Sequence, residues 1–108
     1  MAPRMTVQTL LILQALLRDP GRELYGLELA EDTGLLPGTA YPILLRLENE
    51  GWVTSRWEDI DPHTEKRPPR RYYRLTAGGA TQAVAAVAGA RRPSRAALRG
   101  LAGEGGHA

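Results

Sequence analysis

The part of the sequence best suited to chemistry is a short basic stretch in its second half. It combines cationic and aromatic side chains, namely Lys66, Arg67, Arg70, Arg71, Tyr72, Tyr73 and Arg74. Guanidinium and ammonium groups bind phosphate oxygens, and arginine is attracted by the negative potential of a narrow DNA minor groove. The same stretch also fits a solvated hairpin whose charges only prevent association between sheet edges. An anionic polymer is therefore one candidate partner.

The charges are divided unevenly between the two parts of the chain. Residues 1–65 carry five arginines and eleven acidic residues, a net charge of −6, whereas residues 66–108 carry nine basic residues and one acid, a net charge of +8. The net charge of +2 for the whole chain conceals this difference. The distribution indicates that the second part faces a polyanion, although a basic segment that merely keeps the chain in solution has the same composition.

Candidate catalytic and metal-binding residues are few. The chain has no cysteine, and its two histidines, His63 and His107, lie apart from any second ligand or nucleophile in the sequence. The segment DIDPHTE gathers acidic residues around His63 but lacks the glycine and the spacing of a calcium loop, so a solvated loop is the preferred interpretation. We therefore expect no enzyme activity, no catalytic residues, no cofactor and no metal site.

The elements that must position the basic stretch read as a helix-turn-helix followed by a hairpin. Apolar periodicity and capping residues predict helices over residues 6–18, 25–32 and 39–50, with Gly34 and Gly51 at the ends of the second and third. Alternating side chains predict strands in GWVTSRWEDI and RRYYRLT, which a mobile polar loop joins. Three helices and a two-stranded wing make a winged helix-turn-helix.

The expected fold class is α+β and mainly helical. Residues 1–76 are predicted to form the winged helix-turn-helix domain, and residues 77–101 a last helix that Pro93 ends or breaks. Residues 102–108 are predicted to be a disordered tail. The apolar run Leu10–Leu13 is too short to span a bilayer, so we expect a soluble, cytoplasmic protein that does not bind membranes.

The third helix is the predicted recognition helix, because a helix-turn-helix places the N-terminal turn of its second helix in the major groove of DNA. Gly38 permits a close backbone approach, and Thr39 and Tyr41 offer hydroxyl groups to phosphates or bases. Ala40 is small enough to touch a thymine methyl group. The candidate contacts are Gly38, Thr39, Ala40, Tyr41, Pro42 and Arg46. The alternative is a plain core helix with Tyr41 half buried.

The first and last helices are the predicted subunit interface. The helix over residues 6–18 is apolar around most of its circumference, and a domain this small does not cover every side of it. The last helix carries a narrow stripe of small apolar side chains. The predicted dimerisation residues are Leu10, Leu13, Leu17, Ala83, Val84, Val87 and Leu98. We therefore expect a homodimer.

Three segments carry a resemblance to a known family. LYGLELAEDTG, LPGTAYPILLRLENEGWV and PPRRYYRLTAGG follow one another between Leu24 and Gly79. In this order and spacing they resemble the PadR-type winged helix-turn-helix transcriptional regulators, in the small form with a single C-terminal helix. The resemblance implies a dimeric repressor of the bacterial cytoplasm that binds a palindromic operator. It also implies that a small aromatic or drug-like effector releases the DNA in some members.

The resemblance also implies roles for individual residues. It places several side chains at the major groove, namely Tyr25, Thr39, Tyr41, Pro42 and Arg46. It places a second set in the wing, namely Lys66, Arg67, Arg70 and Arg71. One departure from the family pattern is Leu45, which stands where a basic residue usually precedes the arginine of the recognition helix.

These patterns predict a sequence-specific DNA-binding transcriptional regulator, a repressor whose partners are double-stranded DNA and a second copy of the chain. The alternative is a winged-helix module whose basic surface docks an acidic protein partner. Trp52 and Trp57 either line a pocket for an effector or pack in the core, and core packing is the preferred interpretation.

Overall fold

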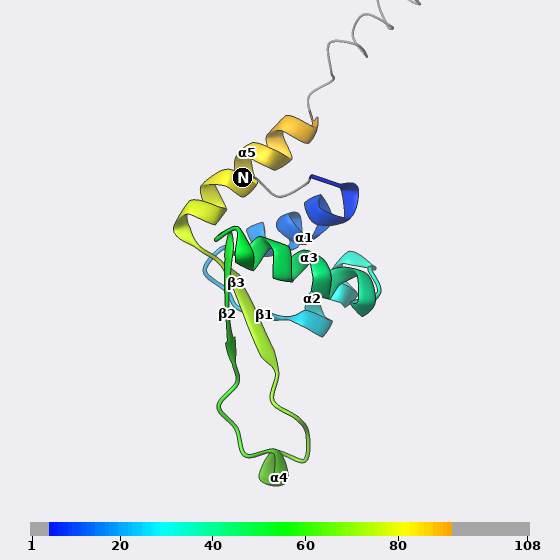
Figure 1. Ribbon diagram of the computed structural model, residues 1–108, viewed down its shortest axis with the longest axis vertical. Helices are drawn as coiled ribbons and strands as arrows, with labels where there is room; N and C mark the ends of the chain where they lie inside the picture. The colour runs from blue at the N-terminus through cyan, green and yellow to red at the C-terminus, as the bar shows by residue number, and fades with distance from the viewer. Residues whose placement is uncertain (1–4, 92–108) are drawn as a thin grey trace, which may run out of the picture.

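The computed structural model describes residues 5–91 of the chain, and a long hairpin projects from its helical part (Figure 1). In chain order the elements are α1 (Val7–Leu17), β1 (Leu24–Tyr25), α2 (Gly26–Thr33), α3 (Pro37–Asn49), β2 (Val53–Trp57), α4 (Pro62–Glu65), β3 (Arg71–Leu75) and α5 (Ala77–Arg91). This confirms the predicted α+β winged helix-turn-helix. The predicted tail and the region around Pro93 lie outside the described residues.

The sheet has three strands in place of the two predicted. β3 lies in the middle and pairs antiparallel with both β1 and β2. Tyr25 pairs with Tyr72, so this tyrosine belongs to β1, and α2 begins at Gly26, one residue later than predicted. A strand of two residues is too short to show an alternation of side chains, and the sequence pattern therefore missed it.

Two prolines shape the front of α3. Pro37 is the first residue of the helix, where a missing N–H costs little, and the N–H of Thr39 donates to the Leu36 carbonyl at 2.9 Å. Pro42 lies inside the helix and has no N–H for the Gly38 carbonyl four residues earlier. The helix thus begins two residues before the predicted start, and its front is stiff.

The core lies where α1, α2, α3, α5 and the sheet meet. Its largest completely buried side chains are Ile12, Leu13, Leu16, Leu29, Leu44 and Leu47. The sheet and the turn before β2 add Leu24, Trp52, Val53, Tyr73 and Leu75. α1 contacts α2, α3 and α5, which explains why this helix is apolar on more than one side.

A glycine lets α5 pack directly on the turn between α3 and β2. The Thr76 hydroxyl caps the helix by accepting the N–H of Gly79 at 2.9 Å, and the Thr76 N–H donates to the Trp52 carbonyl at 3.0 Å. A Cβ atom on Gly79 would overlap the backbone of Trp52. The close approach of α5 therefore requires a residue without a side chain at this position.

One carboxylate closes the base of the wing, which is the segment of residues 58–70 between β2 and β3. Glu58 accepts hydrogen bonds from the Arg67 guanidinium at 2.7 and 3.0 Å and from the Arg70 N–H at 3.2 Å. The guanidinium of Arg67 beside it is the main reason why the pKa of Glu58 is lowered to about 2. The segment predicted as a loop also contains α4, which lies at its far end (Figure 1).

Replacing Gly79 with alanine should destabilise the fold, because the new methyl group forces α5 away from Trp52. We expect Gly79→Ala to lower the free energy of unfolding by about 1–3 kcal/mol in a urea titration. Gly78→Ala is the matched control, since a Cβ at Gly78 meets nothing within 4 Å. That change should stabilise the helix by about 0.5–1 kcal/mol. Equal effects of the two substitutions would contradict the close packing of α5.

The ion pair of Glu58 should make the stability of the wing depend on pH. Because the pKa of Glu58 in the folded chain lies below its ordinary value of 4.5, its stabilisation is complete above that pH and is lost as the pH falls toward 2. Glu58→Gln should therefore lower the thermal midpoint at neutral pH, with a difference from wild type that shrinks in acid. Asp59→Asn, an exposed neighbour, is the control. A constant deficit of Glu58→Gln at every pH would contradict the ion pair.

Candidate nucleic-acid interface

The side of α3 that faces away from the core carries no acid over most of the helix. Its exposed residues are Pro37, Gly38, Thr39, Tyr41, Pro42, Leu45, Arg46 and Asn49. The first acidic residue, Glu48, comes near the C-terminal end and accepts a hydrogen bond from the Ser55 hydroxyl at the base of the wing. The front of the helix is therefore open to a polyanion.

One predicted contact on α3 is wrong. Ala40 is completely buried, with 0 % of its surface exposed, so its methyl group cannot reach a base. The reason is helical geometry, because residues three and four positions apart share one side of a helix. Ile43 and Leu44 follow Ala40 at these spacings and are also buried. Ala40 therefore belongs to the core.

Tyr41 is held between α2 and α3. Its ring lies so close to Gly26 that a Cβ atom on this glycine would overlap it. The rest of the side chain faces solvent, since 42 % of Tyr41 is exposed. Tyr41 is thus half buried, as the core-helix alternative expected, while it stays available to a partner. The tyrosine-glycine pair at the start of α2 consequently helps to fix a side chain of α3.

Tyr25 joins the start of α2 to the wing. Its ring meets that of Tyr72 edge to face, with the ring centres 5.9 Å apart, and the Arg70 guanidinium lies 4.4 Å above its centre. A cation over an aromatic face is attracted by the negative charge of the ring's π system. The structure therefore brings together Tyr25 and Arg70, which the sequence assigned to different parts of the interface.

Several basic side chains have an acidic partner within the chain. Arg67 binds Glu58 as described, and Arg56 binds Glu23 at 2.7 Å, a hydrogen bond that is the main reason why the pKa of Glu23 is lowered. Arg71 lies 3.8 Å from Glu48 and donates to the Ser55 hydroxyl at 3.1 Å. These arginines hold the hairpin in place, which the sequence did not reveal for Arg67 and Arg71.

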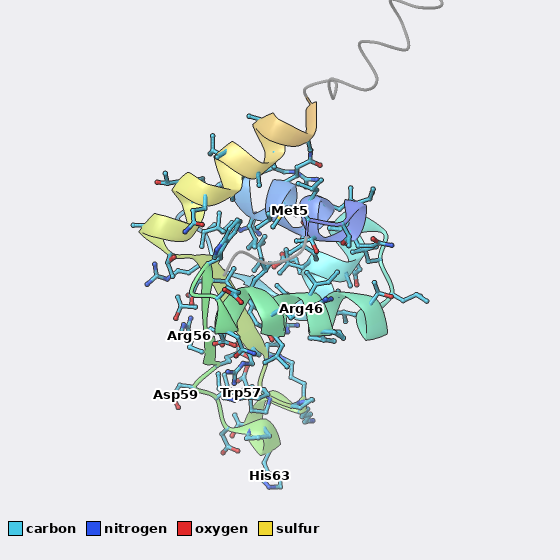
Figure 2. The ribbon with its side chains drawn as sticks, turned by 45° about the horizontal axis from the view of Figure 1, so that its top comes forward. Met5, Arg46, Arg56, Trp57, Asp59 and His63 are labelled. Carbon is cyan, nitrogen blue, oxygen red and sulfur yellow. The ribbon has the colours of Figure 1, made fainter. Side chains whose placement is uncertain are left out.

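A second group of basic side chains has no carboxylate within ion-pair distance among the described residues. Its members are Arg46, Lys66, Arg70 and Arg74. Arg46 lies on α3, and the others lie on the wing or on β3. Figure 2 shows Arg46 on α3 and His63 at the far end of the wing. Three of the predicted contacts, Arg46, Lys66 and Arg70, thus keep their charge available.

The two tryptophans have different environments. Trp52 is 5 % exposed and packs in the core, as the preferred interpretation expected. Trp57, which Figure 2 shows at the start of the wing, is 61 % exposed, and the Arg71 guanidinium lies 5.0 Å from its ring. A cavity of about 520 Å³ opens beside it between the wing, α2 and α3. Its lining includes four aromatic residues and three arginines, namely Tyr25, Tyr41, Trp57, Tyr73, Arg67, Arg70 and Arg71.

The residues predicted for dimerisation are spread over different environments. Leu13 and Ala83 are completely buried inside the single chain, so they are core residues and not part of an exposed interface. Leu10 and Leu17 are partly buried, Val87 is buried, and Val84 is 57 % exposed. Leu98 lies outside the described residues. Two hollows of about 560 and 230 Å³ lie between α1 and α5.

Neither a membrane-spanning helix nor a metal-binding cluster occurs among residues 5–91. None of the helices there is long and apolar enough to cross a membrane. Within the same range, no three residues of the types histidine, cysteine, aspartate and glutamate come together as a metal site would require.

The chain is similar to known regulators. The model of the transcriptional regulator PadR-like family matches residues 12–85. A solved PadR family regulator from Eggerthella lenta is 29 % identical, with a TM-score of 0.58, over 72 % of this chain and 69 % of that one. The MarR family regulator SPO1453 from Silicibacter pomeroyi is 22 % identical, with a TM-score of 0.58, over 81 % of this chain and 55 % of that one.

A complex of MepR from S. aureus with DNA shares the fold as well. It is 18 % identical, with a TM-score of 0.61, over 75 % of this chain and 60 % of that one. The chain thus spans little more than half of the length of the MarR-type structures that it matches. The comparison with curated proteins gives no match. Because the family model covers more than half of the sequence and the fold agrees with it, the chain belongs to the PadR-like family of transcriptional regulators.

Proposed function

We propose that the protein is a sequence-specific DNA-binding repressor of the bacterial cytoplasm, with α3 in the major groove and the wing along the adjacent backbone. One observation carries this proposal. The exposed side of α3 is free of acid over most of its length, and the basic side chains Arg46, Lys66 and Arg70 of α3 and the wing form no ion pair with a carboxylate among the described residues. Cations without an ion-pair partner suit a duplex, whose phosphates attract them without regard to sequence.

The basic residues divide into two roles. Arg46, Lys66 and Arg70 bind phosphates. Arg67 acts indirectly, because its bidentate bond to Glu58 sets the shape of the wing. Thr39 and Tyr41 are exposed at the front of α3, where their hydroxyl groups contact bases or phosphates.

A homodimer is part of the proposal, with α1 and α5 at its interface. The support is the hollow between these helices, next to which Val7 is 71 % and Val84 is 57 % exposed. Leu10 and Leu17 line the same hollows. A two-fold dimer places two copies of α3 on a palindromic operator, with the half-sites about one helical turn apart.

An aromatic effector has a suitable place in the cavity beside Trp57. The rings of Tyr25 and Tyr41 supply apolar walls, and the guanidinium groups of Arg70 and Arg71 supply charge. A planar anion in this cavity would lie between the wing and α3. It would therefore compete with the DNA backbone for the same surface, which is a simple route to the release of the operator.

Removal of one unpaired cation should reduce the salt dependence of DNA binding. We expect Arg46→Ala and Arg70→Ala each to weaken binding to any duplex and to lower the slope of log K against log salt by about 1. Fluorescence anisotropy with a labelled duplex over a series of salt concentrations measures this slope. Arg18→Ala is the control, since Arg18 pairs with Asp32 at 3.8 Å at the end of α1. An unchanged slope for Arg46→Ala and Arg70→Ala would contradict the assignment of phosphate contacts.

A charge at Val84 should break the dimer, because an ion buried in an apolar interface loses its hydration. We expect wild type to elute as a dimer in size exclusion with light scattering, and Val84→Glu as a folded monomer. Ala85→Glu is the matched control, because Ala85 is exposed on the side of α5 away from the buried Ala83 and Val87. A monomeric wild type at micromolar concentration would contradict the proposed interface.

A further inference from the structure

The outermost line of side chains on α3 has almost no hydrogen-bonding capacity. Gly38, Pro42, Leu45 and Asn49 follow one another at spacings of four, three and four residues, so they lie along one side of the helix. This side is opposite to the buried Ile43 and Leu47. Gly38 has no side chain, and the side chains of Pro42 and Leu45 are apolar. The first side chain on this line that can form a hydrogen bond is Asn49, at the end of the helix.

Leu45 is unusually placed for a large apolar residue. It is 58 % exposed, one turn after Tyr41 and next to the unpaired cation Arg46. A single exposed leucine needs no explanation by itself. Here, however, it lies at the centre of the surface proposed to enter the major groove, where the polar residues Thr39 and Arg46 stand only at the margin.

The floor of the major groove offers few partners for such a surface. The base edges carry nitrogen and oxygen atoms that form hydrogen bonds, and the C5-methyl group of thymine is the apolar group among them. A leucine above polar edges would remove their water without replacing its hydrogen bonds, which is unfavourable. Above a thymine methyl group, both partners remove apolar surface from water.

We propose that Pro42 and Leu45 read thymine C5-methyl groups in each half of the operator. This inference rests on the proposed function and adds the kind of base that α3 selects. Pro42 and Leu45 are exposed and can reach a methyl group, whereas the buried Ala40 cannot.

The experiment replaces thymine with deoxyuridine, which lacks only the methyl group and keeps every hydrogen-bonding atom. Duplexes that bind the full chain are first selected from a random pool. The best of them is then synthesised with thymine or with uracil at each position. We expect wild type to bind about fourfold more weakly for each contacted methyl group that is removed, the factor given by burying one such group.

Two variants distinguish the recognition of thymine methyl groups from sequence-independent binding to DNA. Leu45→Ala should lose the preference for thymine over uracil at the positions that Leu45 contacts, keep it at those that Pro42 contacts, and retain the salt slope of wild type. Arg70→Ala should bind both duplexes more weakly and keep their ratio. Circular dichroism checks that both variants are folded, which the exposure of Leu45 favours.

The failure of methyl recognition and the failure of DNA binding give different results. Equal binding of the two duplexes by wild type, or an unchanged ratio in Leu45→Ala, overturns the methyl reading but leaves DNA binding in place. Salt-dependent binding without any selected sequence overturns it as well. The absence of salt-dependent binding to any duplex overturns the proposed function, and the methyl reading with it.

Discussion

The structure depends on the register of β3. Tyr73 and Leu75 are buried on the inner side of this central strand, so Tyr72 and Arg74 must point to the outer side. A slip of one residue would exchange the two sides and bring charge into the core. The same register pairs Tyr72 with Tyr25, and it thereby sets where β1 ends and where α2 begins. The strand thus links the core, the helix-turn-helix and the wing.

The distribution of charge on the surface depends on which arginines form ion pairs with carboxylates of the same chain. The first part of the chain is acidic, yet several of its carboxylates bind arginines of the hairpin, as Glu23 binds Arg56 and Glu58 binds Arg67. In these pairs the negative charge of each carboxylate next to the wing is neutralised by an arginine. Arg46 and Lys66, by contrast, are exposed and form no ion pair among the described residues, although the net charge of the whole chain is only +2.

Much of this architecture could be predicted from local signals. Thr6 and Gly34 marked helix ends correctly, because capping depends on neighbours in the sequence. The hairpin followed from alternation. The short strand β1 did not, since its existence depends on a partner almost fifty residues later, roughly the span from Tyr25 to Tyr72. The small size of Ala40 suits a contact with a thymine methyl group, but its burial depends on which side of α3 packs against the core.

The site was harder to predict than the fold. The sequence located its basic residues, but it did not show which of them were paired. Arg67 and Arg70 stand close together in the same segment, yet the first binds a carboxylate and the second lies over a ring. Such choices depend on where Glu58 and Tyr25 lie in space. Composition and spacing contain no information on these positions, so the pairing had to come from the structure.

The contact between Gly26 and Tyr41 has a consequence for variation in this surface. Any side chain at position 26 would require the ring of Tyr41 to move or to be replaced by a smaller one, so position 26 cannot change independently of position 41. Thr39, Leu45 and Arg46 are exposed, so their side chains have room to vary. A lineage or an engineer that changes the preferred operator can therefore alter these residues one at a time. A side chain introduced at Gly26 instead requires a matched change at Tyr41, in a different helix.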